Sequence, residues 1–115
     1  MRKDDATRIK HMLNAAKEAH SFISGKSRSD LDADRKLTLA LVKDIEIIGE
    51  AANKVSQEAR DKQPEIPWLD IVNMRNRLIH AYFDIDLDVV WDTVIKDLPP
   101  LVAELEKIVF SARKS

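Results

Sequence analysis

One stretch of the chain, from about Asp34 to Lys62, constrains the fold more than any other. Its apolar residues recur every three or four positions, and this spacing predicts a long amphipathic α-helix. The stripe consists of Leu37, Leu41, Ile45, Ile48, Ala52 and Val55. Ala40, Val42, Ile47 and Ala51 widen it beyond one face, which predicts a helix buried on more than one side. The second partner can be another subunit, and Gly49 would permit a close approach.

The remaining segments also favour helices. Helical spacing predicts helices from about Asp4 to Ser24, from Pro67 to His80 and from Leu87 to Ala112, with a kink or division at Leu98–Leu101, where Pro99 and Pro100 stand. The chain contains only 2 Gly and 4 Pro in 115 residues, a scarcity typical of long helices. The sequence therefore predicts an all-α fold, a bundle of four to five helices in one domain spanning residues 1–115.

Charge and composition limit the classes of function. The formal net charge is −1, so the whole molecule does not attract nucleic acid, and any RNA site must be local. The chain has no cysteine, which excludes disulfides and thiolate chemistry. Its first residues lack the apolar stretch of a signal peptide, and no apolar run is long enough for a membrane span. We therefore expect a cytoplasmic protein that has no membrane partner.

The segment Arg75–Tyr82 carries the unusual chemistry. On a helical wheel, Arg75 falls near the centre of a broad apolar arc. That arc contains Trp68, Ile71, Val72, Met74, Leu78, Ile79, Tyr82 and Phe83. A guanidinium there must either face a cleft or pair with a carboxylate, and Glu46 and Glu50 are the candidates. Arg77 falls on the opposite, solvated side.

Asn76 and His80 are four residues apart on the same predicted helix, so their side chains can touch at the border of its two faces.

No combination of residues predicts a metal site. His11 and His20 fall on opposite sides of the first predicted helix, so they cannot share a metal ion from that helix. Asp84, Asp86 and Asp88 lack the central glycine and the terminal glutamate of a calcium-binding loop. Asp86 or Asp88 is instead expected to cap the last helix. We therefore expect neither a metal ion nor another cofactor.

The motif from Arg75 through His80 to Tyr82 resembles the Arg-x4-His-x-Tyr motif of HepT, a toxin family within the HEPN superfamily. Other blocks between Leu37 and Val109 also resemble this family. They are Ile47–Ala52, Pro64–Trp68, Met74–Arg77, His80–Phe83 and Asp97–Leu101. Together these ordered blocks are specific, whereas a bare Arg-x4-His pattern is not. One departure is Asn73, which stands where the family often has glycine, but it removes no catalytic group.

The resemblance implies a HEPN-like, dimeric toxin that is a metal-independent endoribonuclease. Its catalytic residues would be Arg75, which can stabilise the phosphate in the transition state, and His80, whose pKa suits proton transfer near pH 7. Asn76 could orient His80 or the phosphate, and Tyr82 could stack on a base or bind the phosphate. A two-fold homodimer would bring two motifs together.

The resemblance also implies a partner, an MntA-like nucleotidyltransferase antitoxin that would transfer AMP to Tyr82 and so block RNA binding. The alternative is a non-catalytic helical module that binds or presents substrate to a nucleotidyltransferase. The intact Arg75/His80 pair favours the ribonuclease, because a docking module does not require it.

Overall fold

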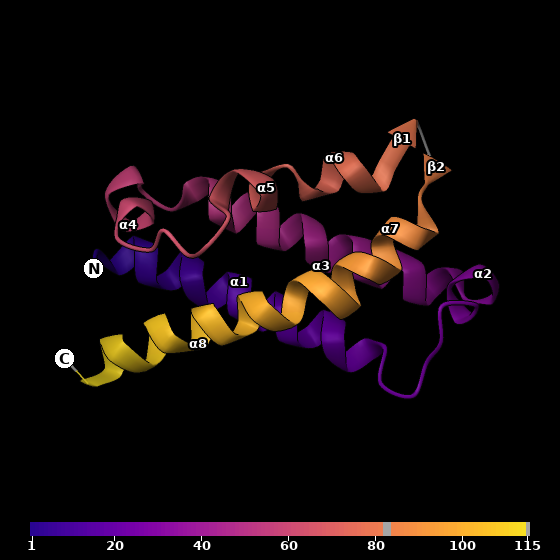
Figure 1. Ribbon diagram of the computed structural model, residues 1–115, viewed down its shortest axis with the longest axis horizontal. Helices are drawn as coiled ribbons and strands as arrows, with labels where there is room; N and C mark the ends of the chain where they lie inside the picture. The colour runs from indigo at the N-terminus through magenta and orange to yellow at the C-terminus, as the bar shows by residue number, and fades with distance from the viewer. Residues whose placement is uncertain (82–83, 115) are drawn as a thin grey trace.

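Three long helices form the body of the molecule. The computed structural model describes residues 1–81 and 84–114, with the backbone alone at residues 80, 81 and 112–114. Helix α1 (Lys3–Phe22) packs against both α3 (Arg35–Lys54) and α8 (Leu98–Lys114), and α8 crosses α1 (Figure 1). Their contact buries the largest core side chains completely, including Ile9, Met12, Leu41, Ile45, Ile48, Leu98 and Leu105. The predicted all-α class is confirmed.

Helix α3 is buried on more than one side, as its wide apolar stripe predicts, but its partners belong to the same chain. Helix α1 covers one side, and the short helices α5 (Trp68–Val72) and α6 (Met74–Leu78) cover another. A Cβ atom added at Gly49 would lie 3.2 Å from the carbonyl oxygen of Ile71, which is closer than most side chains tolerate. The close approach predicted at Gly49 is therefore a contact between α3 and α5. The width of the stripe consequently needs no second subunit to explain it.

The predicted continuation of α3 to Lys62 is wrong, because the chain turns at Val55 and Ser56. Ser56 caps a separate helix, α4 (Gln57–Asp61), by accepting a hydrogen bond from the amide of Ala59. The buried carboxylate of Asp5 accepts hydrogen bonds from the amide of Ser56 at 2.8 Å and from its hydroxyl at 2.7 Å. These bonds lower the pKa of Asp5. They also tie α1 to the turn between α3 and α4.

The segment predicted as one helix from Pro67 to His80 is divided. Helices α5 and α6 meet at Asn73, and α6 ends at Leu78. Strand β1 (Ile79–Ala81) follows and pairs antiparallel with β2 (Asp84–Ile85), placing Ile79 opposite Ile85. The amide of Asp86 donates to the carbonyl of Leu78 at 2.6 Å and closes the base of this hairpin. The hairpin projects at one end of the molecule, beyond α6 (Figure 1).

The last helical region is continuous but changes pitch. Asp86 caps α7 (Leu87–Asp92) by accepting from the amide of Val89, as predicted. A π-helical turn (Thr93–Asp97) joins α7 to α8, just before the predicted division at Leu98–Leu101. Pro99 and Pro100 have no amide hydrogens, so two helical hydrogen bonds across this turn cannot form. A further short helix, α2 (Asp30–Ala33), lies in the connection between α1 and α3.

These breaks give eight α-helices in the described part of the chain, more than the four to five predicted. None of these described helices is long and apolar enough to cross a membrane.

One ionisable side chain, Asp44, is buried within the contact between α1 and α3 and is only 2% exposed. Its Oδ2 atom has no hydrogen-bond partner in the described part of the chain. Burial raises the pKa of Asp44 to about 7, and the neighbouring carboxylate of Glu18 adds to the effect. At neutral pH a large fraction of Asp44 is therefore protonated, because its charged form is costly in this position.

We expect Asp44→Asn to stabilise the fold at pH 8 and to flatten its pH dependence. In the native protein Asp44 binds its proton more tightly than in the unfolded chain. Its stabilising contribution is thus present below pH 3.8, the ordinary pKa of an aspartate, and is lost as the pH rises towards about 7. Thermal unfolding measured by circular dichroism from pH 4 to pH 8 would show this. The exposed Asp4→Asn is the matched control, and an Asp44→Asn protein with an unchanged pH profile would contradict the prediction.

Candidate functional site

Arg75 lies on the surface of α6, not at the centre of a buried arc. Its side chain is 54% exposed, and its Nε donates to Oε1 of Glu46 on α3 at 3.1 Å. Of the two partners considered from the sequence, the structure selects Glu46. The side chain of Arg75 donates no other hydrogen bond within the described part of the chain. Its two Nη groups therefore retain their donors for another acceptor.

The wheel misplaced Arg75 because it treated residues 67–80 as one regular helix. The amide and the side-chain Nδ2 of Asn73 both donate to the carbonyl of Leu69, and the helix restarts at Met74. In the restarted helix Met74 and Leu78 take the buried positions. Arg75 consequently falls at the border of the buried face, where the acidic side of α3 meets solvent.

A shallow hollow of about 140 Å³ surrounds Arg75. Helix α3 supplies Glu46, Gly49, Glu50 and Asn53, and the α5–α6 segment supplies Val72 and Arg75. The absence of a side chain at Gly49 lets α5 approach α3 and brings Arg75 within reach of Glu46. The guanidinium is therefore held in place by one carboxylate while remaining open to a solvent-borne anion.

Asn76 is exposed on α6, one residue beyond Arg75. The predicted i,i+4 contact between Asn76 and His80 within one helix is wrong, because α6 ends at Leu78 and His80 belongs to strand β1. The extended backbone changes both the direction and the spacing of the segment. The side chain of His80 and the whole of Tyr82 lie outside the described residues.

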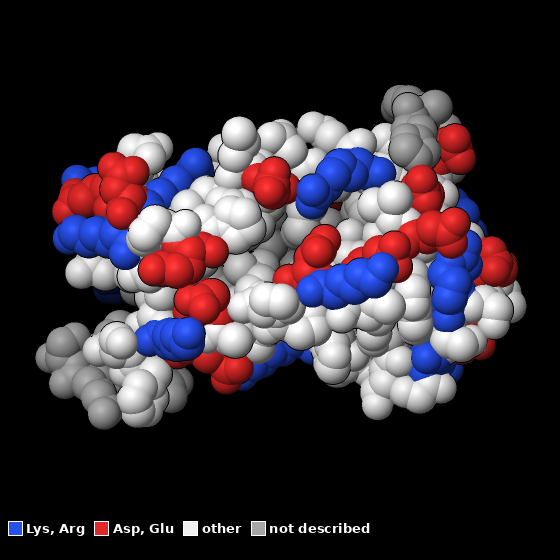
Figure 2. Space-filling model, in the orientation of Figure 1, with Lys and Arg blue, Asp and Glu red and all other residues white. Residues whose placement is uncertain are grey.

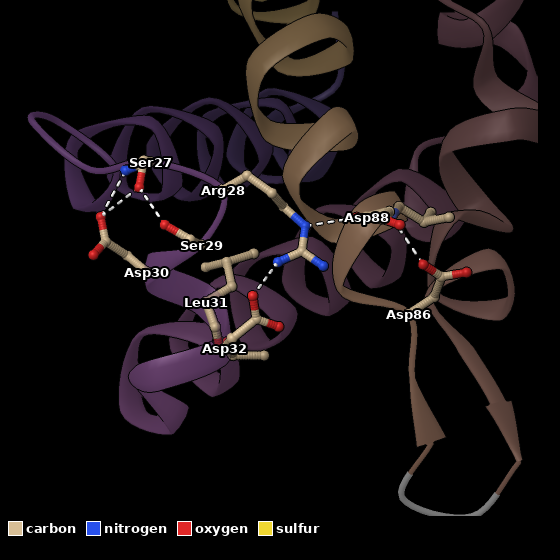
Figure 3. A network of polar contacts seen from close by, with 10 residues as sticks. Ser27, Arg28, Ser29, Asp30, Leu31, Asp32, Asp86 and Asp88 are labelled. Carbon is tan, nitrogen blue, oxygen red and sulfur yellow. Dashed lines mark hydrogen bonds and ion pairs between the residues drawn. The ribbon is translucent and has the colours of Figure 1, made fainter.

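The hairpin that carries His80 is anchored at its base. Half-buried Ile79 and Ile85 pack against the core. Arg28, in the connection between α1 and α3, donates from Nε to Asp88 of α7 at 2.6 Å and from Nη1 to Asp32 at 3.1 Å. Figure 3 shows Arg28 lying between these two carboxylates, close to the end of the hairpin that enters α7. No sequence pattern predicts the contact between Arg28 and Asp88, because the two residues are 60 positions apart.

Three charged residues near Arg75 and His80 were also considered in the sequence: Arg77, Asp86 and Asp88. Arg77 is exposed, as predicted, and faces a different hollow from Arg75. Asp86 caps a helix and Asp88 pairs with Arg28. Among the described residues, no group of three or more His, Asp or Glu side chains could hold a metal ion.

Comparisons with known proteins place the chain in a family. The sequence profile of the family described as "Ribonuclease HepT-like" matches residues 12–108. A "Putative RNase" of Caldanaerobacter subterraneus subsp. tengcongensis is 35% identical over 100 residues, which cover 87% of this chain and 89% of that protein. A "Probable ribonuclease HepT" of Thermococcus cleftensis is 42% identical over 79 residues, covering 69% of this chain and 72% of that protein.

A third relative is a "Gamma-glutamylcyclotransferase and putative RNase" of Methanocaldococcus jannaschii. It is 37% identical over 108 residues, which cover 94% of this chain but only 49% of that protein. The chain thus spans about half the length of this relative. No solved structure was found to match the chain. The family profile covers most of the chain, including α6 and the hairpin, and the chain therefore belongs to the HepT-like ribonuclease family.

Proposed function

We propose that this protein is the toxin of a toxin–antitoxin pair, a metal-independent endoribonuclease with Arg75 and His80 as its catalytic residues. The observation that carries the proposal is the state of Arg75. Its guanidinium is half exposed and is fixed by Glu46 through Nε alone. Arg75 therefore keeps its outer donors available for a phosphate, which a guanidinium binds in a bidentate fashion.

The chemistry of RNA makes such a small site sufficient. The 2′-OH of the ribose attacks the adjacent phosphorus, the P–O5′ bond breaks, and the products are a 2′,3′-cyclic phosphate and a 5′-hydroxyl. A base must take the proton from the 2′-OH, and an acid must give one to the leaving 5′-oxygen. His80 can serve in either step, because imidazole titrates near neutral pH. Arg75 stabilises the negative charge on the five-coordinate phosphorus, and Asn76 orients the phosphate or His80.

We expect Arg75→Ala and His80→Ala each to reduce RNA cleavage by about 100- to 1000-fold, which corresponds to about 2.7–4 kcal/mol of lost transition-state stabilisation. Arg77→Ala, the matched control two residues away on the other face of α6, should cost far less. Cleavage of single-stranded RNA is measured with EDTA present, and the ends of the products are identified by mass spectrometry.

Circular dichroism should show that Arg75→Ala still folds, because an exposed ion pair contributes little to stability. Full activity of a folded Arg75→Ala protein, 5′-phosphate products or loss of activity on chelation would each contradict this mechanism. If the wild-type chain does not cleave RNA at all, the alternative of a non-catalytic module paired with a nucleotidyltransferase takes its place.

The active unit we propose is a homodimer with the α6 segments of two chains facing a shared cleft. One arginine and one histidine give little positive charge for binding RNA, and a two-fold axis would double it. The protein's net charge of −1 makes such local concentration of cations necessary. Light scattering of the purified chain at micromolar concentration should give the mass of a dimer, and a stable, active monomer would contradict the shared cleft.

The partner we propose is an MntA-like nucleotidyltransferase antitoxin that modifies Tyr82. In this reaction the phenol oxygen of Tyr82 attacks the α-phosphorus of ATP, pyrophosphate leaves, and AMP remains attached to the tyrosine. The added phosphate would stand two residues from His80 and could occupy Arg75 in competition with RNA.

With the partner enzyme and ATP supplied, we expect mass spectrometry to find AMP on Tyr82 and RNA cleavage to cease. Tyr82→Phe should still cleave RNA but resist inactivation, because only the acceptor hydroxyl is lost. Modification confined to other residues, or inactivation of the Tyr82→Phe protein to the same degree, would refute this regulation.

A further inference from the structure

A groove between α5–α6 and the start of α8 lies on the side of α6 away from Arg75. It encloses about 350 Å³, within the range of about 300–1,000 Å³ typical of ligand sites. Its apolar floor is formed by Ile66, Ile71, Met74, Leu98 and Leu101. In Figure 2 it is the hollow near the centre of the face, with charged atoms along its rim.

The rim of this groove is predominantly acidic. Glu65, Asp70, Asp97 and Glu104 supply four carboxylates, against the two cations Arg77 and Lys96. Glu104 pairs with Lys107 at 3.1 Å, and Lys96 lies 3.5 Å from Asp92. The other three carboxylates, Glu65, Asp70 and Asp97, are exposed. They make no ion pair within the described part of the chain. Among the described residues, three carboxylates beside an apolar floor therefore stand without cationic partners.

The charges are also separated along the groove. Helices α5 and α6 run towards the hairpin, whereas α8 runs away from it (Figure 1). Glu65, before α5, and Glu104, along α8, consequently lie towards the same end of the groove. Arg77 on α6 and Lys96 before α8 lie towards the other end. A segment bound in the groove would meet mainly negative charge along most of its length and positive charge only near the hairpin.

We propose that this groove binds an amphipathic segment of a partner protein whose central side chains are apolar and whose lysines or arginines face the acidic rim along most of its length. The apolar side chains would cover the floor, and the basic residues would pair with Glu65, Asp70 and Asp97. RNA does not fit, because its phosphates would meet more carboxylates than cations. The inference does not depend on the ribonuclease activity proposed for the opposite side of α6.

The test uses a fluorescein-labelled helical peptide with central leucines and lysines on both sides of them, and a second peptide with glutamates in place of the lysines. Fluorescence anisotropy with the full chain should detect binding of the lysine peptide and much weaker binding of the glutamate peptide. The triple variant Glu65→Gln, Asp70→Asn and Asp97→Asn should weaken binding of the lysine peptide by about tenfold, equivalent to about 1.4 kcal/mol. This loss is what three exposed ion pairs of ordinary strength would give.

A matched variant with Asp4→Asn, Asp61→Asn and Glu106→Gln removes three exposed carboxylates elsewhere and should leave peptide binding unchanged. Arg75→Ala should also leave it unchanged, which separates this inference from the proposed catalytic site. The proposal is overturned if the lysine peptide does not bind, if both peptides bind equally, or if the two triple variants weaken binding equally.

Discussion

The contact between α3 and α5 at Gly49 determines the arrangement of the functional half of the molecule. A Cβ atom at this position would lie 3.2 Å from the carbonyl oxygen of Ile71, which is closer than most Cβ atoms approach another atom. Because the two backbones meet there, α6 continues along α3, and Arg75 reaches Glu46 at 3.1 Å. A glycine inside a helix lowers the stability of the helix by about 1 kcal/mol relative to alanine. The close contact it permits is the physical reason that the helix tolerates it.

The short helix α6 places its two arginines, Arg75 and Arg77, at two different hollows on the surface. Met74 and Leu78 hold it against the core, and this fixes the directions of the residues between them. Arg75 turns towards α3 and its acidic surface, whereas Arg77 turns towards the groove beside α8. Two arginines separated by one residue therefore face two different hollows, and both hollows contain carboxylates.

The predictions made for the site failed where they assumed one unbroken helix from Pro67 to His80. Glu46 was one of two carboxylates considered for Arg75, and the solvent-exposed position of Arg77 was correct. The burial of Arg75 and the helical pairing of Asn76 with His80 were wrong. Both errors come from Asn73 and Leu78, where the helix restarts and then ends. A helical wheel has no means of detecting such breaks.

The sequence by itself determined the all-α class, the long apolar helix that becomes α3, the cap at Asp86 and the family resemblance of the Arg75–Tyr82 segment. These features depend on local periodicity, capping chemistry and residue identity, which neighbouring residues in the chain specify. Only the tertiary structure decided the end of α3 at Val55, the pairing of Arg28 with Asp88 and the groove beside Arg77. Asp5 bonds to Ser56 across 51 positions and Arg28 to Asp88 across 60. Contacts of this kind form only when packed helices bring distant segments together, so no local pattern contains them.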